Sequence, residues 1–304
     1  MSKRPAPPGQ LIDIRADGGM SPFYLHLWRQ GQGRPVAILD TGLGGNSLVW
    51  ANTLAAVAQV TEACAYDRPG SGWSDPAPAN QPRTSQRIVE ELRLALGAAG
   101  LQPPHILVGH SAGAIHMLVF AKRYPQEVAG LVLVEPSHPE MFTRLKEVPG
   151  PSAMVALYGG LAGLGRVGLL RWLGPGYLKL LLPDGPRTLS PDTWQALRYF
   201  AMQGHDYAAA RREAAAGPAS FAAARVAPGG LGDLPLIVLT ADWWVTGKRS
   251  KLKQGFVPLR EEMARFSTRG RHVIVTGCDH ASLPLVRPDA VADAVREVLA
   301  ARAG

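Results

Sequence analysis

The sequence predicts an α/β protein in which a mostly parallel central sheet is covered by helices on both faces. Short, nearly uninterrupted apolar runs alternate along the chain with longer segments of helical periodicity. Strands that are apolar throughout are typical of parallel sheets, which are buried on both faces by the helices that join their strands. The 304 residues, of which 46% are hydrophobic, are enough for one large domain with an inserted segment.

The first expected elements form an antiparallel hairpin at one edge of the sheet. Apolar runs at 11–14 and 23–28 flank Asp17, Gly18 and Gly19, which are turn-forming residues. The further strands are expected at 36–40, 61–67, 105–109, 130–135, 236–242 and 272–277. Helices are expected at 47–58, 84–99, 112–124 and 288–301. In such a sheet, clefts form outside the carboxyl ends of the strands.

The pattern changes between residues 137 and 232. Apolar helical stretches at 154–158 and 169–182 occur there with no convincing strand between them. We therefore expect an α/β core domain built from residues 1–136 and 233–304, with a helical cap or lid inserted at 137–232. A helical extension of the core without a gating role is the alternative.

Charge and cysteine content limit the classes of function. The net charge is +8, but the 32 basic residues are scattered and no nucleic-acid-binding motif accompanies them, so we expect no nucleic-acid partner. Cys64 and Cys278 lie in strand-like segments, which favours reduced thiols and a cytoplasmic location. The first ten residues lack the apolar core of a secretory signal. We expect no membrane span, and no grouping has the spacing of metal ligands.

A Gly-x-Ser-x-Gly pattern, Gly109-His-Ser-Ala-Gly113, lies between an expected strand and an expected helix. Its placement is more informative than the pattern, because a strand–turn–helix junction lifts the central serine out of the sheet. The free amide groups at the start of the following helix favour developing negative charge. We therefore predict that Ser111 is a nucleophile.

A serine nucleophile needs a general base, usually a histidine held by a carboxylate. Of the eight histidines, His280 is placed best, because it follows the last expected strand and precedes the terminal helix. That position agrees with the chain order serine, acid, histidine of this architecture. We predict that His280 is the base.

Four segments together resemble the α/β-hydrolase fold-1 family: 40–45 (DTGLGG), 66–75 (YDRPGSGWSD), 109–113 (GHSAG) and 279–280 (DH). The resemblance implies the α/β-hydrolase fold, and we expect its chemistry to need no cofactor. It also implies an oxyanion hole formed by the backbone amides of Leu43 and Ala112. The chain departs from many relatives in having Thr41-Gly42 where they have His-Gly.

The carboxylate that orients His280 has two main candidates, Glu135 and Asp242, each at the end of an expected strand. In most relatives the acid follows the later strand in a Gly-x-x-Asp arrangement. Here that arrangement would put Trp244 at the aspartate position. Glu135 stands where haloalkane-dehalogenase-like members carry their acid. We favour Glu135, keep Asp242 as the alternative acid, and consider Asp279 a weaker third.

These residues predict a serine hydrolase that cleaves a carboxylic ester or lactone through an acyl-enzyme. The apolar lid favours a small-molecule substrate that is hydrophobic and of medium size. Alternatives on the same fold are an amidase or aminopeptidase, a carbon–carbon hydrolase and a cofactor-free haloperoxidase. Serine at position 111 argues against dehalogenase and epoxide-hydrolase chemistry, which use an aspartate nucleophile in this fold. A non-catalytic ligand receptor stays open, because a fold does not fix a function. A homodimer also stays open.

Overall fold

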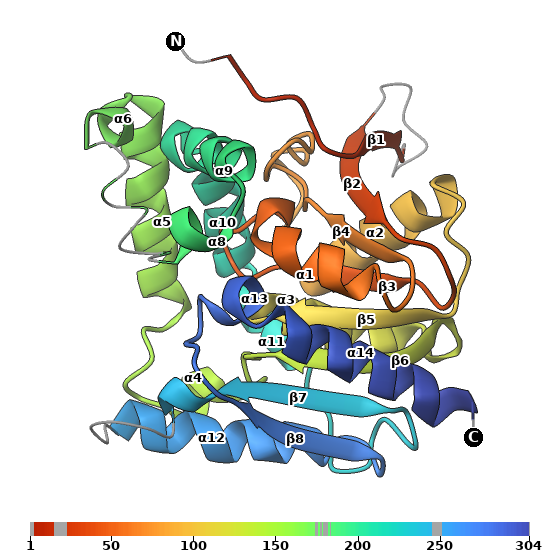
Figure 1. Cartoon of the computed structure of the whole chain (residues 1–304). Coiled ribbons are helices and arrows are strands. Elements are labelled where there is room, and N and C mark those ends of the chain that lie inside the picture. The colour runs from red at the N-terminus through yellow and green to blue at the C-terminus, as the bar shows by residue number, and fades with distance from the viewer. Residues whose placement is uncertain are drawn as a thin grey trace.

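The computed structural model of the chain describes residues 3–14, 23–173, 176, 178, 182, 184–244 and 251–303. Within them, the expected mostly parallel sheet is confirmed, with eight strands in the order β1-β2-β4-β3-β5-β6-β7-β8 (Figure 1). The strands are β1 (Gln10–Asp13), β2 (Tyr24–Gln30), β3 (Ala37–Asp40), β4 (Ala63–Tyr66), β5 (His105–His110), β6 (Val128–Val134), β7 (Leu236–Ala241) and β8 (Gly270–Val275). β2 is antiparallel to β1 and β4, and the other pairs are parallel.

The strands of the expected edge hairpin pair as predicted. Gln10 lies opposite Leu27 and Asp13 lies opposite Tyr24. The expected turn at 17–19 lies outside the described residues. The sequence therefore located the antiparallel edge of the sheet.

The other strands differ from expectation by one or two residues at one or both ends, and two of them show this clearly. The strand expected at 61–67 begins at Ala63. The strand expected at 272–277 runs from Gly270 to Val275. It stops there because Gly277 has a φ of 77°, a backbone conformation outside the β region that glycine adopts readily. This turn starts the loop that carries His280.

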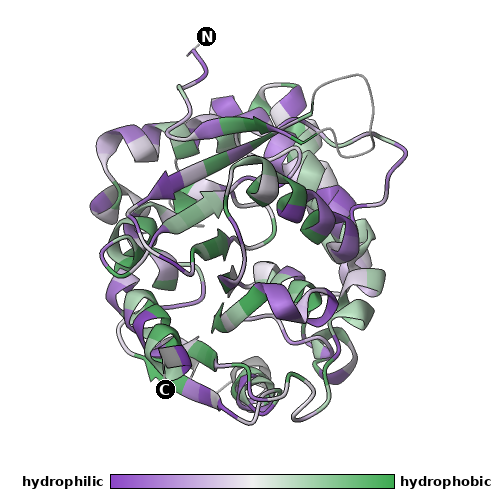
Figure 2. Ribbon diagram, turned by 90° about the vertical axis from the view of Figure 1, so that its right-hand side faces the viewer, coloured by the Kyte–Doolittle hydropathy of each residue, from purple (hydrophilic) through white to green (hydrophobic). Residues whose placement is uncertain are grey.

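Helices cover both faces of the sheet, as expected. α1 (Ala51–Val57) and α14 (Pro288–Ala303) pack on one face, and α2 (Ser85–Ala98) and α3 (Ala112–Arg123) pack on the other (Figure 1). The helix expected at 84–99 begins where the Thr84 side chain accepts a hydrogen bond from a backbone amide of the first turn. Figure 2 shows that the strands in the middle of the sheet are hydrophobic. Two buried apolar layers therefore hold the strand ends in place.

A group of helices lies between β6 and β7. It comprises α4 (Met141–Arg144), α5 (Pro151–Arg166), α6 (Leu169–Leu173), α8 (Gly185–Thr188), α9 (Pro191–Gln203), α10 (His205–Ala215) and α11 (Gly217–Ala223). α5 packs along α10, and Figure 1 places α5, α6, α9 and α10 beyond one end of the sheet. We call α5, α9 and α10 the cap helices. The division into a core and a cap at 137–232 stays a prediction.

The remaining elements are short turns and one longer helix. They are η1 (Ser47–Trp50), η2 (Pro125–Glu127), η3 (Asp242–Trp244), α12 (Lys251–Ala264) and α13 (Leu283–Val286). α12 packs against β7 and β8. Among the helices described, none combines the length and apolar character that crossing a membrane would require.

Candidate active site

Ser111 lies at the sharp turn between β5 and α3. Its φ of 53° and ψ of −117° are a strained conformation for a residue other than glycine. A Cβ atom at Gly109 would lie 2.7 Å from Ala114 Cα, and one at Gly113 would lie 2.5 Å from the carbonyl oxygen of Asp40. The two glycines therefore allow β5, α3 and the end of β3 to approach closely enough for this turn to form.

His280 lies on the loop after β8, within reach of Ser111. Its Nε2 atom is 3.1 Å from Ser111 Oγ, and its Nδ1 atom is 2.9 Å from Glu135 Oε2. The His280 side chain is 41% exposed, whereas Glu135 is completely buried. The structure thus brings together Ser111, His280 and Glu135, which the sequence placed at three distant positions.

Glu135 follows β6 and is held on its other oxygen by two donors. Its Oε1 atom accepts hydrogen bonds from the Ala241 amide at 2.6 Å and from Arg260 Nη1 at 2.9 Å. Burial alone would raise the pKa of Glu135, but the Arg260 charge and the hydrogen bonds from His280 and Ala241 lower it to about 2. Glu135 is therefore a carboxylate at neutral pH, and it presents Oε2 to the imidazole.

The other two candidate acids anchor the loop after β8. Asp242 Oδ1 accepts hydrogen bonds from the amides of Gly277 and Cys278, at 3.0 and 3.4 Å. Asp279 Oδ1 accepts from the amides of Ala281 and Ser282, at 3.0 and 2.8 Å. Through these hydrogen bonds, both aspartates stabilise the conformation of the loop. The geometry favours Glu135 over Asp242 as the acid that orients the imidazole.

The expected oxyanion residues lie on either side of the nucleophile. A Cβ atom at Gly42 would be 3.2 Å from Ser111 Cβ, so the turn that continues into Leu43 lies against the serine. Ala112 is the first residue of α3, where backbone amides have no acceptor within their own helix. Thr41 and Gly42 thus form a backbone turn beside Ser111. The roles of Leu43 and Ala112 as donors stay predictions.

Comparisons with known proteins identify the fold. A family model described as the alpha/beta hydrolase fold matches residues 35–165. The chain has the α/β-hydrolase fold. An esterase structure from Thermogutta terrifontis has a TM-score of 0.66 and 19% identity, with 96% of this chain and 99% of that chain covered. An enol-lactonase structure from Burkholderia xenovorans LB400 has a TM-score of 0.64 and 18% identity, with 94% and 98% covered.

Curated relatives match shorter segments of the chain. A putative carbamate hydrolase, RutD, from Caulobacter segnis is 31% identical over 112 residues, which are 37% of this chain and 41% of the relative. The uncharacterized protein YqjL from Bacillus subtilis is 31% identical over 109 residues, or 36% and 42%. The chain thus spans less than half the length of these relatives.

Two cavities meet at Ser111 and His280. The first, about 580 Å³, lies between the turn at 41–45 and the cap helices. Its apolar lining includes Val49, Met154, Leu157, Leu161, Leu178, Leu182 and Leu197. The second, about 490 Å³, is lined by Pro136, Met141, Val148, Pro149, Trp243, Phe256 and Arg260. A third cavity, about 850 Å³, lies between the N-terminal segment and α9, and neither Ser111 nor His280 lines it.

The sequence alone did not single out three residues that support the site. Arg260 contacts Glu135, Tyr158 donates to the carbonyl oxygen of Leu43, and Arg68 contacts the turn at 41–45. Arg68 lies within the motif at 66–75, which could have indicated it, whereas Arg260 is a buried charge on the apolar side of α12. Within the part of the chain that the structure describes, no group of three or more His, Cys, Asp and Glu side chains could hold a metal ion.

Proposed function

We propose that this hydrolase cleaves a carboxylic ester or lactone, with Ser111 as nucleophile, His280 as general base and Glu135 as the acid. The observation that carries the proposal is the continuous hydrogen-bonded chain from Ser111 Oγ through both ring nitrogens of His280 to Glu135 Oε2, at 3.1 and 2.9 Å. A nucleophile, a base and an orienting carboxylate in this relation are the parts that acyl transfer needs.

The reaction follows from the position of each atom. His280 Nε2 accepts the proton of Ser111 Oγ as the oxygen attacks the carbonyl carbon, and Glu135 stabilises the resulting imidazolium. The carbonyl oxygen takes up negative charge beside the amides of Leu43 and Ala112; each such donor is worth about 3 kcal/mol of barrier lowering. When the C–O bond breaks, His280 returns the proton to the leaving alcohol. Water then attacks the acyl-enzyme by the same route.

The shape and lining of the cavities support an apolar substrate with substituents on both sides of the carbonyl. The two cavities of about 580 and 490 Å³ both reach Ser111 and His280, and each is lined mainly by apolar side chains. An acyl group and an alcohol group of moderate size could therefore occupy separate spaces. Because RutD relatives are named putative carbamate hydrolases, carbamates are a second substrate class to test.

The experiment is a panel of chromogenic esters of increasing acyl length, together with lactones and carbamates, assayed on the wild type and on Ser111→Ala. We expect turnover of medium-length esters by the wild type and its loss in the variant. A fluorophosphonate probe should label the wild type at Ser111. No hydrolysis of any substrate and no labelling would instead favour the non-catalytic receptor.

A further inference from the structure

The turn that would supply an oxyanion amide is held by side chains from outside its own segment. Arg68 is buried, and it donates to the carbonyl oxygens of Thr41 and Gly42, at 2.7 and 2.9 Å. The Tyr158 hydroxyl, from cap helix α5, donates to the carbonyl oxygen of Leu43 at 3.1 Å. Two side chains therefore fix three consecutive carbonyl groups of the turn.

These bonds determine the direction of the Leu43 amide. The Gly42 carbonyl and the Leu43 amide belong to one trans peptide unit, in which C=O and N–H point in opposite directions. Since the carbonyl points to Arg68, the Leu43 N–H points away from Arg68. Gly42 itself lies against Ser111. The guanidinium therefore sets the orientation of the amide that the proposed mechanism uses.

Arg68 is in turn oriented by two carboxylates from different parts of the chain. Nη1 donates to Asp40 Oδ1 at 2.5 Å, and Nε donates to Glu213 Oε1 at 2.9 Å. Burial alone would lower the pKa of Arg68, but the charges of Glu213 and Asp40 raise it above its ordinary value. Asp40 ends β3, whereas Glu213 belongs to cap helix α10. The guanidinium thus joins the turn to the cap.

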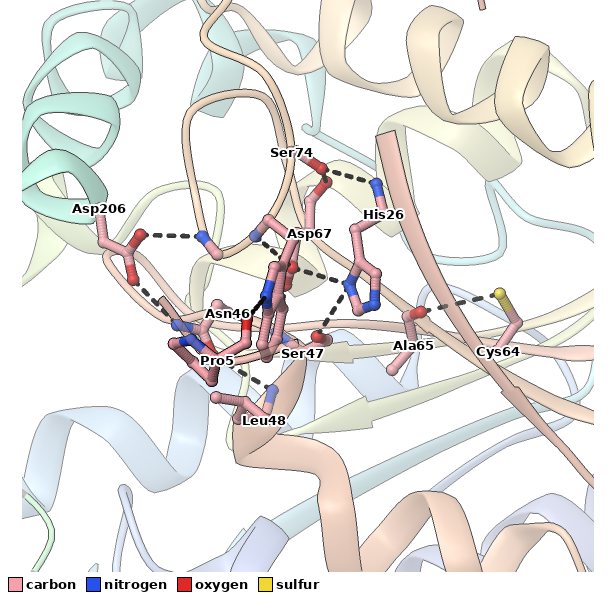
Figure 3. A network of polar contacts seen from close by, with 12 residues as sticks. Pro5, His26, Asn46, Ser47, Leu48, Cys64, Ala65, Asp67, Ser74 and Asp206 are labelled. Atoms are coloured by element: carbon pink, nitrogen blue, oxygen red, sulfur yellow. Dashed lines mark hydrogen bonds and ion pairs between the residues drawn. The ribbon is translucent and has the colours of Figure 1, made fainter. Parts of the chain in front are cut away.

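A second contact ties α10 to the far end of the same turn. Asp206 of α10 accepts hydrogen bonds from Asn46 Nδ2 and from the Gly72 amide, both at 2.9 Å (Figure 3). The Asp67 carboxylate accepts from the Ser47 amide at 2.6 Å and so fixes the next residue to the core. The turn is therefore held between α10 on one side and the core on the other.

We propose that Arg68 is a positioning residue for the oxyanion hole and that Glu213 couples this hole to cap helix α10. The role in catalysis rests on the proposed function, while the coupling itself is a property of the fold. Its consequence is that loss of the Glu213 contact should lower turnover although Glu213 touches neither Ser111 nor His280.

The kinetic test compares Glu213→Ala, Glu213→Gln and Arg68→Lys with the wild type on the best ester. Glutamine can still accept a hydrogen bond from Arg68 Nε, so Glu213→Gln should keep wild-type kcat. The kcat of Glu213→Ala should fall about 10-fold, and that of Arg68→Lys about 10- to 100-fold. KM should change little in each case. The matched control is Glu91→Ala. It breaks another buried ion pair, Arg83–Glu91, which has no contact with the turn, and it should leave kcat unchanged.

A second readout does not depend on hydrolysis. In protein labelled with ¹⁵N-leucine, the Leu43 amide signal, assigned by its loss in Leu43→Ile, should shift in Glu213→Ala and in Tyr158→Phe but not in Glu91→Ala. An unmoved signal in Glu213→Ala overturns the coupling, and a moved signal with unchanged kcat overturns the positioning role. If the wild type hydrolyses nothing, the proposed function fails, and the Leu43 signal still decides the coupling. If Arg68→Lys does not fold, the Glu213 and Tyr158 variants carry the test.

Discussion

At the scale of single residues, Glu135 combines complete burial with a charge that persists at neutral pH. Its pKa is lowered to about 2 because Arg260, His280 and the Ala241 amide all stabilise the carboxylate. A buried charge is costly unless it is paired and hydrogen-bonded, and here both oxygens are occupied. That arrangement suits a group whose task is to hold an imidazole and stabilise its protonated form.

The two candidate acids can be ranked by isosteric variants. Glu135→Gln removes the charge that stabilises the His280 imidazolium, so kcat/KM for an ester should fall by roughly 10³- to 10⁴-fold with the fold retained. Asp242→Asn should cost less than about 10-fold, because it weakens loop contacts to the amides of Gly277 and Cys278 and leaves the bond between Glu135 and His280 in place. Steady-state kinetics with circular dichroism checks both. The reverse ranking would transfer the role to Asp242.

Arg260 should matter most at acidic pH. Without its guanidinium, the carboxylate of Glu135 loses its strongest electrostatic support, so its pKa rises and it protonates at a higher pH. We expect the activity of Arg260→Met relative to the wild type to be roughly 10-fold lower at pH 5 than at pH 8. Arg144→Met, which breaks the surface pair with Glu262, is the control. An equal loss at both pH values would contradict this role.

The residues of the site were predictable to different degrees. Ser111 and His280 could be predicted from local sequence and chain order. Ser111 lies between a strand and the following helix, and His280 lies between the last strand and the terminal helix. The sequence favoured Glu135 but left Asp242 open as the alternative, because both residues end neighbouring parallel strands and the path of the loop after β8 is not visible in the sequence. Arg260 was not predictable, because it meets Glu135 across 125 positions of sequence.

At the scale of elements, the close approach of α3 to the ends of β3 and β5 depends on glycines at defined positions. Gly113→Ala should destabilise the fold by about 1–3 kcal/mol and lower kcat, since its Cβ would lie 2.5 Å from the carbonyl oxygen of Asp40. Gly97→Ala in α2 has open space and should stabilise by about 0.5–1 kcal/mol. Urea unfolding measures both, and equal stabilities would refute the packing argument.

The order of elements was more predictable than their ends. Apolar runs and helical periodicity report burial and therefore indicate β5, β6 and β7 well. Strand ends depend on turn geometry, as at Gly277, where a positive φ stops β8 before the run of β-type residues is complete. Tertiary contacts such as Glu213 with Arg68 join segments whose sequences carry no common pattern.

At the scale of the whole molecule, several histidines are buried in the neutral form. Burial lowers the pKa of His105 and His138 to about 4, and burial with the neighbouring His280 lowers that of His110 to about 3. The unfolded chain binds protons at these residues near pH 6.5, whereas the folded protein does not. Folding therefore excludes protons, and acid must favour the unfolded state.

The stability of the protein should accordingly decline as pH falls from 6.5 to about 4, by about 1.4 kcal/mol per pH unit for each such histidine. Asp40 acts in the opposite sense between pH 6 and 3.8, because burial raises its pKa to about 6 and the folded state then binds the extra proton. Burial also raises the pKa of Asp206, but the three histidines outnumber the two aspartates, so the net slope stays positive. Urea unfolding at pH 7.5, 6 and 5 measures this slope. His138→Asn should lower the slope by the contribution of one proton. The asparagine side chain can still accept the hydrogen bond from the Glu140 amide. A stability that is constant over this range would mean that these side chains are protonated inside the fold.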